Sequence, residues 1–177
     1  MRDEGVAPDG RPAAVLIALM DRDTGISVLL TRRADHLHDH PGQVSFPGGR
    51  IDQGDASSID AALREAEEEV GLPRSGVQVL GTLPAYRTVT GYHITPVVAW
   101  VRAEMDLCAD PFEVAEIFEV PLEFLMVADN YRRQFWVHDG VVGEGWAVTY
   151  RDYFIWGATA GMLHRLMVCL GSEGGGA

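Results

Sequence analysis

The chain has 177 residues, of which 47% are hydrophobic and 23% are charged, and its formal net charge is -12. This length and composition predict one globular domain with a buried core and exclude an intrinsically disordered chain. All the basic residues are arginine. The acidic balance argues against general nucleic-acid binding, which needs a basic surface, but arginine suits forked contacts to single phosphates.

Two apolar segments near the start of the chain predict a pair of neighbouring strands. They cover residues 13–20 and 26–33, with a turn between them. The first segment lacks the flanks of a signal peptide and is too short to cross a bilayer, so we expect a cytoplasmic protein without a membrane partner. We expect residues 1–11 and 171–177 to be a flexible lead-in and tail of a single domain over residues 1–177.

The next segment, residues 57–70, has the period of an amphipathic helix. Ser57 is in position to cap its start, and Gly71 ends it. The apolar stripe of this helix consists of Ile59, Ala62, Leu63, Ala66 and Val70.

The rest of the chain predicts further strands and a closing helix. Residues 77–83 and 93–101 are expected as strands, and residues 134–140 and 146–154 as the arms of a late hairpin. Because strands and helices mix without strict alternation, we expect an α/β fold in which a sheet lies between helices. The closing helix, residues 155–170, has an apolar side made of Ile155, Ala158, Met162, Leu166 and Cys169.

The first helix ends in an acidic cluster, REAEEEVGL. At 3.6 residues per turn, Glu65, Glu68 and Glu69 share a face. Like charges at this spacing destabilise a helix, and the negative end of the helix dipole adds to the repulsion. A solvated acidic face is the alternative, but such a face normally carries compensating basic residues, and only Arg64 is near. Oxygen ligands alone predict a site for Mg²⁺ or Mn²⁺ rather than zinc.

With the glycines upstream, this cluster resembles the signature of the Nudix hydrolases. That signature is a glycine, five residues, an acid, a spacer and then REUxEExGU, where U is apolar, and residues 64–72 match its second half fully. In the first half, Gly49 is followed by Asp55 instead of a glutamate, and the spacer to Arg64 is one residue longer than usual. We expect the extra residue to lengthen only the loop before the helix. The resemblance covers residues 13–170 and implies an α/β/α sandwich with a mixed β-sheet.

A second resemblance is to the coenzyme A pyrophosphatase branch of that family. The branch motif runs approximately LLTxRS, three residues, R, three residues, G, three residues and FPGG, and the sequence departs from it at Ala34 and His38. His38 stands where a second arginine is expected, and histidine holds a phosphate less firmly because it is mainly neutral at pH 7. The matching residues are Leu29, Leu30, Thr31, Arg33, Gly42 and Phe46 to Gly49.

Three histidines in this segment, His36, His38 and His40, raise the alternative of a zinc site. Their spacing is close to the HxHxDH run of metallo-β-lactamase-like hydrolases but is one residue short of it. No cysteine or distant His–Asp pair clearly completes a zinc set. We therefore expect the histidines to edge the pocket or face solvent, with His40 matching a histidine common in the coenzyme A branch.

The resemblance implies a metal-binding and catalytic centre on the helix. Glu65 and Glu69 are the expected metal ligands, and Glu68 is a third ligand or a catalytic group that orients water. The carbonyl of Gly49, or of the glycine before it, is an expected backbone ligand. Arg64 would hold the carboxylates in place.

A general base is expected from a later loop, because the family often recruits a glutamate there. Glu113 fits best, since a similar EV precedes a VPL stretch in the coenzyme A branch, and Glu116 is the alternative. Either side chain could instead merely face solvent.

Four residues are expected to contact the substrate. Arg33 and Arg50 are the expected phosphate contacts, His38 would touch a second phosphate, and Tyr92 would stack on the base. For the two arginines the alternative is a surface ion pair, and for Tyr92 it is a place in the core.

The implied reaction is metal-dependent hydrolysis of a nucleoside diphosphate linked to another moiety, with Mg²⁺ or Mn²⁺ as cofactor. Coenzyme A is the first expectation, giving 3′,5′-ADP and 4′-phosphopantetheine. ADP-ribose, NADH and dinucleoside polyphosphates remain alternatives, as does a nucleotide-binding module without activity. The only partners expected are a small nucleotide and, because family members are often dimers, a second copy of the chain.

Overall fold

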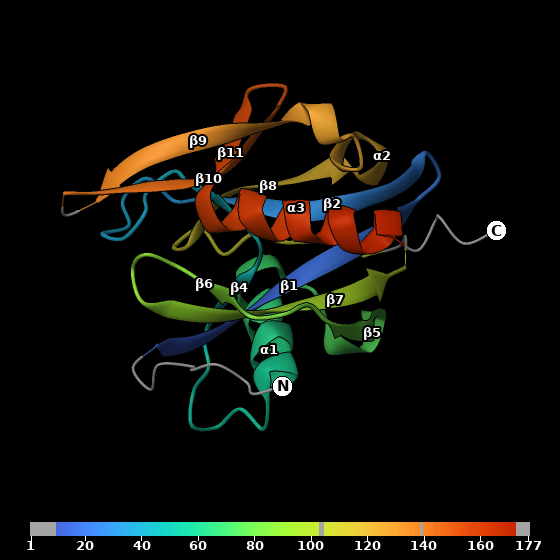
Figure 1. Cartoon of the computed structure of the whole chain (residues 1–177). Helices are drawn as coiled ribbons and strands as arrows, with labels where there is room; N and C mark the ends of the chain where they lie inside the picture. The colour runs from blue at the N-terminus through green and yellow to red at the C-terminus, as the bar shows by residue number, and fades with distance from the viewer. Residues whose placement is uncertain (1–9, 103–104, 139, 173–177) are drawn as a thin grey trace, which may run out of the picture.

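The computed structural model describes residues 10–102, 105–138 and 140–172 (Figure 1). The larger of its two sheets contains β1 (Arg11–Arg22), β2 (Gly25–Arg33), β3 (Val44–Ser45), β4 (Gly48–Arg50), β5 (Val77–Thr82), β6 (Tyr86–Arg87), β7 (Tyr92–Val101) and β8 (Val114–Pro121). The smaller sheet contains β9 (Tyr131–His138), β10 (Val141–Tyr150) and β11 (Tyr153–Trp156). The helices are α1 (Ser58–Val70), α2 (Leu122–Leu125) and α3 (Gly157–Ser172), with short 3-10 turns at Arg74–Gly76 and Ala128–Asn130.

The larger sheet is mixed, because β1 runs parallel to β7 and antiparallel to its other partners. The first half of β1 pairs with β4, at Ala13 to Val15, and its second half pairs with β2, at Leu19 to Arg22. The sheet therefore divides along β1. This division places the glycines of β4 beside the start of β1 and next to α1.

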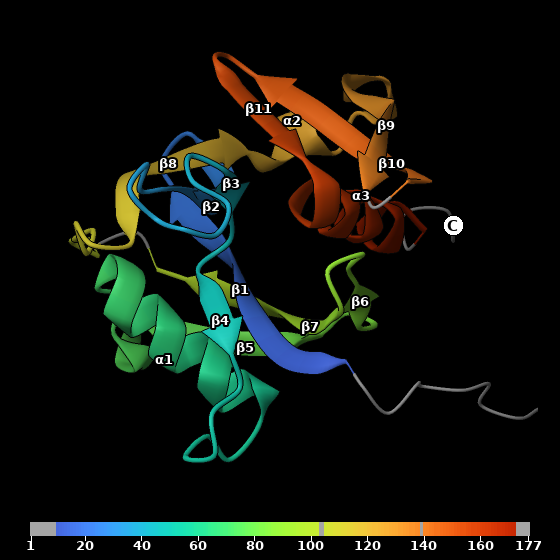
Figure 2. The same ribbon diagram turned by 90° about the vertical axis from the view of Figure 1, so that its left-hand side faces the viewer.

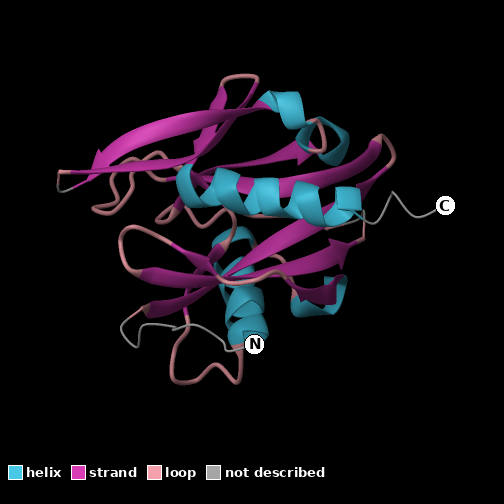
Figure 3. Ribbon diagram, in the orientation of Figure 1, coloured by secondary structure: helices cyan, strands magenta, loops and turns pink. Residues whose placement is uncertain are grey.

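Helices cover both faces of the larger sheet (Figures 2 and 3). Alternate residues of a strand point to opposite faces, so Leu16 and Met20 of β1 pack with α1, whereas Ile17 and Leu19 pack with α3 and the smaller sheet. The expected α/β/α sandwich with a mixed sheet is confirmed. None of the helices in the described ranges has the length and apolar character that crossing a membrane requires.

Helix α1 begins and ends as its sequence predicts. The side chain of Ser57 accepts a hydrogen bond from the backbone N–H of Asp60 at 3.2 Å, which caps the first turn. Gly71 follows the helix with φ 67°, a left-handed conformation that glycine adopts without a side-chain clash. One charged residue, Glu69, is buried beside the alanines of the helix core. That burial needs a reason beyond packing.

The late hairpin differs from its expected limits. Strand β9 pairs with β10 as expected, but β10 begins at Val141 and already includes Gly143 and Gly145. A Cβ atom at either glycine would lie within about 2.6 Å of the ring of Trp136, so the glycines make room for that ring on the neighbouring strand. The segment after Tyr150 turns into β11 instead of continuing the hairpin.

Strand β8 was not expected from the sequence, and it pairs with β2 along almost its whole length. The expected closing helix is present as α3, but its apolar side was partly wrong. Ile155 belongs to β11, and Cys169 is exposed, as is Cys108. Residues Val168 and Leu170 are exposed as well, so the last turn of α3 lies beyond the elements that cover its middle.

The expected lead-in and tail fall mainly outside the described residues, which start at Gly10 and end at Ser172. Strand β1 begins at Arg11, and α3 continues to Ser172. Arg11 therefore belongs to the sheet, which corrects the expectation of a flexible lead-in as far as residue 11.

Candidate active site

Three glutamates come together beside β4, namely Glu65 and Glu69 of α1 and Glu113 of the loop before β8. Glu65 and Glu69 are one turn apart on the helix, so they face the same side. The carboxyl group of Glu113 lies within hydrogen-bonding reach of Glu69, and its charge acts on both helix glutamates. The structure thus brings together two predicted metal ligands and the predicted general base.

Glu69 is the most buried member of this cluster, with only 5% of its surface exposed. Its Oε2 accepts a hydrogen bond from the backbone N–H of Gly48 at 3.1 Å. Burial raises the pKa of Glu69 well above the ordinary carboxyl range, and the negative charges of Glu65 and Glu113 raise it further. Burial also raises the pKa of Glu65. Buried carboxylates this close together favour either a proton or a bound cation.

The two glycines of β4 allow the carboxylates to approach the backbone. A Cβ atom at Gly49 would lie 2.6–2.9 Å from the carboxyl atoms of Glu65, and one at Gly48 would clash with the carbonyl of Ala14. Only glycine leaves room for this arrangement. The pair therefore brings its backbone against the glutamates, where a carbonyl oxygen could serve as a further ligand.

Replacing Gly49 with alanine should separate fold from activity. The new methyl group meets the mobile end of Glu65, so we expect the fold to remain while the carboxylate moves aside. A shift of about 1 Å in a catalytic group can lower turnover about 100-fold. Steady-state hydrolysis and thermal unfolding of Gly49→Ala would measure the two effects. Gly54→Ala is the matched control, because a Cβ atom there meets nothing within 4 Å. Equal turnover in the two variants would contradict the close approach.

Arg64 connects the site to the loop that precedes α1. Its Nη1 donates to Glu65 at 3.0 Å and to Glu68 at 3.2 Å, and its Nη2 donates to the carbonyl of Arg50 at 3.2 Å. Glu68 is the outer member of this group, since its side chain is 59% exposed. The geometry makes Arg64 a positioning residue for Glu65 and leaves Glu68 at the rim of the cluster.

Asp55 holds Arg64 from the other side. Both of its oxygens accept from the guanidinium, each at 2.9 Å, and its side chain is only 4% exposed. The guanidinium, helped by the backbone N–H of Asp52, lowers the pKa of Asp55 to about 2. Asp55 lies in the loop before α1, and its carboxylate reaches the guanidinium of Arg64 although aspartate is one methylene shorter than the glutamate of the signature. The sequence did not predict this bidentate contact between the guanidinium of Arg64 and the carboxylate of Asp55.

The loop carrying Glu113 is fastened to the end of α1. The backbone N–H of Cys108 donates to the carbonyl of Val70, and that of Asp110 donates to the carbonyl of Glu69, both at 2.9 Å. The carbonyl of Glu113 in turn accepts from the N–H of Ala34 at 2.9 Å. These bonds place Glu113 opposite the helix glutamates.

The alternative base, Glu116, is committed elsewhere. It accepts a hydrogen bond from Tyr153 at 2.5 Å and pairs with Arg32 at 3.5 Å. Two such partners hold its carboxylate on a different part of β8. Glu116 therefore has a structural role between the two sheets, and Glu113 is the better candidate for a base.

The predicted substrate contacts are spread around this centre. Arg33 lies at the end of β2, and its buried Nε has no hydrogen-bond partner within the described chain. Arg50 is exposed at the end of β4, and its Nη2 donates to the hydroxyl of Tyr92 at 3.1 Å. Tyr92 is partly buried at the start of β7 rather than in the core. Neither Arg33 nor Arg50 forms an ion pair with a carboxylate of the described residues.

The three histidines lie on the loop between β2 and β3, and all are exposed. The imidazole of His38 is fully exposed and has Asp39 as its neighbour at 3.7 Å. As the side chains stand, no three His, Cys, Asp or Glu groups in the described ranges are arranged to hold a metal. This holds for the glutamate cluster as well as for the histidines. The glutamate side chains would therefore have to move closer together to coordinate an ion.

The chemistry of the glutamate cluster nevertheless fits a hard divalent cation. Its donors are carboxylate and carbonyl oxygens, which suit Mg²⁺ or Mn²⁺. Glu69 and Glu65 carry raised pKa values because their charges are buried and close together, and a bound cation would relieve both effects. Glu68 and Glu113 are exposed enough to turn toward an ion by side-chain rotation.

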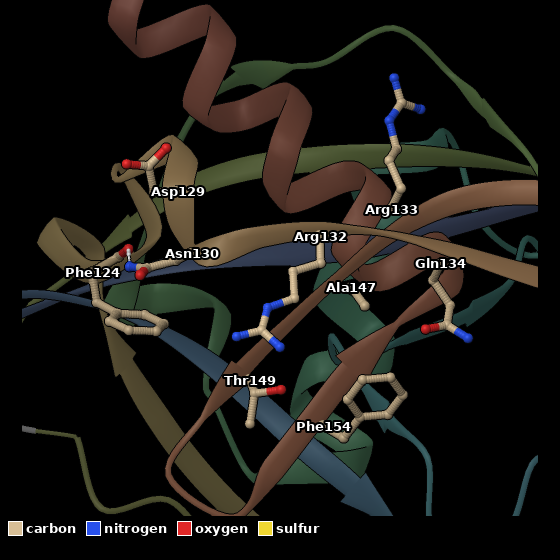
Figure 4. Close-up of a pocket in the computed structure, with 9 residues that line it drawn as sticks. All are labelled: Phe124, Asp129, Asn130, Arg132, Arg133, Gln134, Ala147, Thr149 and Phe154. Carbon is tan, nitrogen blue, oxygen red and sulfur yellow. Dashed lines mark hydrogen bonds between the residues drawn. The ribbon is translucent and has the colours of Figure 1, made fainter.

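A separate groove lies on the outer face of the smaller sheet (Figure 4). It is lined by residues that include Phe124, Arg132, Gln134, Thr149 and Phe154. No predicted site residue lines it, so it does not belong to the candidate active site.

Comparison with known proteins gives a consistent assignment. The family model for the NUDIX domain matches residues 10–135. The Nudix hydrolase NudL of Escherichia coli K12, described as uncharacterized, is 44% identical over 161 residues, which cover 91% of this chain and 83% of that protein. Its counterpart in Enterobacter sp. strain 638 is 44% identical over 163 residues, covering 92% and 84%.

Solved structures show the same fold at lower identity. A Nudix hydrolase from M. smegmatis, RenU, has a TM-score of 0.62 at 23% identity and covers 92% of this chain and 86% of its own. A binary complex of a C. elegans Ap4A hydrolase has a TM-score of 0.60 at 18% identity and covers 91% and 98%. The fold, the matched domain and the relatives together show that the chain belongs to the Nudix hydrolase family.

Proposed function

We propose that the protein is a divalent-metal-dependent pyrophosphohydrolase whose catalytic centre is formed by Glu65, Glu69 and Glu113. The observation that carries this proposal is the burial of Glu69 against the backbone of Gly48 with two further carboxylates beside it. Such an arrangement destabilises a metal-free protein and contributes nothing to a simple binding module. Family membership supports the same class of reaction.

The metal would be held by Glu65 and Glu69, with Glu68 and the carbonyl of Gly49 as additional oxygen ligands. When bound, Mg²⁺ or Mn²⁺ supplies positive charge that neutralises the oxygens of the diphosphate as the linkage breaks. The residues of the chain then have separate tasks. Arg64 keeps Glu65 and Glu68 oriented, because it donates hydrogen bonds to both.

Glu113 would take the proton from the attacking water. It is exposed, it faces the cluster, and its loop is tied to the end of α1. A carboxylate placed within hydrogen-bonding reach of a nucleophilic water acts as a general base. Arg33, which is partly exposed at the end of β2, would donate from its guanidinium to a phosphate oxygen.

Coenzyme A is the substrate that we propose first, giving 3′,5′-ADP and 4′-phosphopantetheine. Support comes from the match of residues 29–49 to the coenzyme A pyrophosphatase motif, and from the loop of His38 lying next to β3 and β4 in the chain. ADP-ribose, NADH and dinucleoside polyphosphates are the competing substrates. The C. elegans relative is described as an Ap4A hydrolase, but at 18% identity it supports the fold alone.

A substrate panel tests this proposal. Purified protein would be incubated with coenzyme A, dephospho-coenzyme A, ADP-ribose, NADH and diadenosine tetraphosphate, each with Mg²⁺ or Mn²⁺, and the products resolved by chromatography. We expect cleavage within the diphosphate of coenzyme A at the highest kcat/KM. Preference for another member of the panel would overturn the assignment of coenzyme A as the substrate. No cleavage of any member would overturn the proposed pyrophosphohydrolase activity.

His38 gives a sharper test of substrate choice. If its loop reads the 3′-phosphate, His38→Arg should restore a permanent charged donor that the branch motif contains. Charge-assisted hydrogen bonds are worth about 1.5–3 kcal/mol, so kcat/KM for coenzyme A relative to dephospho-coenzyme A should rise about tenfold. His36→Arg serves as the control, since it adds the same charge two residues away. An unchanged ratio in His38→Arg would show that residue 38 does not contact the 3′-phosphate.

A further inference from the structure

A cluster of two arginines and a tyrosine lies across β4 from the glutamates. Arg11, at the start of β1, and Arg50, at the end of β4, both donate to the hydroxyl of Tyr92, at 3.4 and 3.1 Å. Both guanidiniums also lie over the Tyr92 ring, 4.9 and 5.9 Å from its centroid. Two positive groups therefore converge on one side chain in a strongly acidic protein.

The position of the cluster follows from strand alternation. Gly49 pairs with Ala14, whose side chain packs with α1, whereas Arg50 pairs with Ala13 and points to the other face. Arg11 lies two residues before Ala13 and shares that face, where it pairs with Tyr92 of β7. Adjacent residues of β4 thus reach the glutamates on one side and the arginine cluster on the other.

The hydrogen-bond pattern leaves the cluster with donors to spare. A phenol oxygen can accept two hydrogen bonds and donate one. The two arginines fill the acceptor sites of Tyr92, and no described residue accepts its proton. Asp39 and Asp52 lie in the same region as Arg50, but among the described residues neither forms an ion pair with Arg50 or Arg11.

Backbone hydrogen bonds hold Tyr92 and the start of β1 in place. Its N–H donates to the hydroxyl of Thr88 at 3.0 Å, and its carbonyl accepts from the N–H of Thr88 at 3.0 Å. The N–H of Arg11 donates to the carbonyl of Gly91 at 2.9 Å. The guanidiniums of Arg11 and Arg50 converge on this anchored tyrosine with donors to spare, an arrangement that suits a phosphate dianion.

We propose that Arg11, Arg50 and Tyr92 form a second anion subsite, which binds a phosphate group of the substrate other than the diphosphate that is cleaved. Arg11 is the specificity-determining residue of this subsite. The proposal rests on the proposed function, since it assumes that a nucleotide occupies the site beside β4. The phosphate is either a monoester on the ribose or an outer group of a longer polyphosphate chain.

Equilibrium binding of adenine nucleotides tests the subsite. Calorimetric titrations with Ca²⁺ in place of Mg²⁺, with chromatography to check that each nucleotide stays intact, would compare adenosine 3′,5′-bisphosphate, adenosine 5′-tetraphosphate and AMP. We expect the wild type to bind the bisphosphate about tenfold more tightly than AMP, as one additional charge-assisted contact implies. Arg11→Gln should abolish this advantage, and Tyr92→Phe should reduce it. Arg132→Gln is the control, because Arg132 lies in the separate groove on the smaller sheet (Figure 4).

Each outcome has a definite meaning. An Arg11-dependent advantage for the tetraphosphate alone supports the subsite and assigns its phosphate to a longer chain. An advantage that survives in both Arg11→Gln and Tyr92→Phe, with folded proteins by circular dichroism, overturns it, as does the absence of any advantage in the wild type. If the protein hydrolyses members of the substrate panel but shows no binding advantage for the additional phosphate, only the subsite proposal fails. If it shows that binding advantage but hydrolyses nothing, only the proposed activity fails.

Discussion

Glu69→Gln should lower turnover by about three orders of magnitude and leave the protein folded. The substitution removes a charged ligand from the centre of the site, and the charge stabilisation that a metal supplies in the transition state is worth several kcal/mol. The amide oxygen of glutamine can still accept from the N–H of Gly48, so the backbone of β4 keeps its partner. Steady-state kinetics at saturating Mg²⁺ would measure the loss.

The same variant should be more stable than the metal-free wild type at alkaline pH. The pKa of Glu69 is raised in the folded protein, so folding favours the protonated carboxyl. Stability is then greatest at low pH and declines as the pH rises through the folded-state pKa. Thermal unfolding between about pH 5 and about pH 8 in EDTA should show this decline in the wild type and a weaker one in Glu69→Gln. Each kcal/mol regained corresponds to about 2–4 °C in Tm.

Two results would contradict this account of Glu69. Full turnover of Glu69→Gln at saturating Mg²⁺ would exclude the residue as a ligand. A variant that unfolds more easily than the wild type at every pH would show that the buried charge stabilises the fold.

Glu113→Gln should lower kcat by about 10²–10⁴-fold with little change in KM, because loss of a general base affects the reaction step rather than binding. The matched control is Glu116→Gln, three residues along the same strand region, where Tyr153 and Arg32 hold the carboxylate away from the cluster. We expect Glu116→Gln to lower Tm and to leave kcat within a factor of about three. Single-turnover and steady-state measurements would separate the reaction step from product release.

A larger loss of kcat in Glu116→Gln than in Glu113→Gln would assign the general base to Glu116. If Glu116→Gln loses activity while Glu113→Gln retains it, the loop before β8 serves only to cover the end of α1. Loss in both variants with a fall in Tm would instead point to damage in β8, which pairs with most of β2.

The parts of the fold and site that local sequence determines could be predicted. Helix α1 follows from its apolar stripe, its serine cap and its terminal glycine, and the acidic cluster follows from spacing on one helix face. The pairing of β1 with β2 follows from two apolar runs and a short turn. Glu113 was found only through a resemblance, since a single exposed glutamate in a loop has no local pattern of its own.

The parts that depend on distant contacts could not be predicted. Strand β8 was missed because Glu116 and Glu119 interrupt its apolar pattern, and each carboxylate is satisfied by residues far away in the chain. Arg11 was assigned to a loose lead-in because only the parallel pairing with β7 places it beside Tyr92. Asp55 gave no indication of its contact with Arg64, which depends on how the loop folds back over the helix.

The most direct test of the central claim is a titration of metal-free protein with Mn²⁺, in which bound metal and hydrolysis are followed in the same samples. Electron paramagnetic resonance would report free Mn²⁺, and chromatography would report the products of the preferred substrate. We predict that turnover rises in proportion to bound Mn²⁺ and that Glu65→Gln combined with Glu69→Gln loses both. Unchanged Mn²⁺ binding in the double variant, or full hydrolysis by wild-type protein without bound metal, would contradict the claim that these buried glutamates form a metal-dependent catalytic centre.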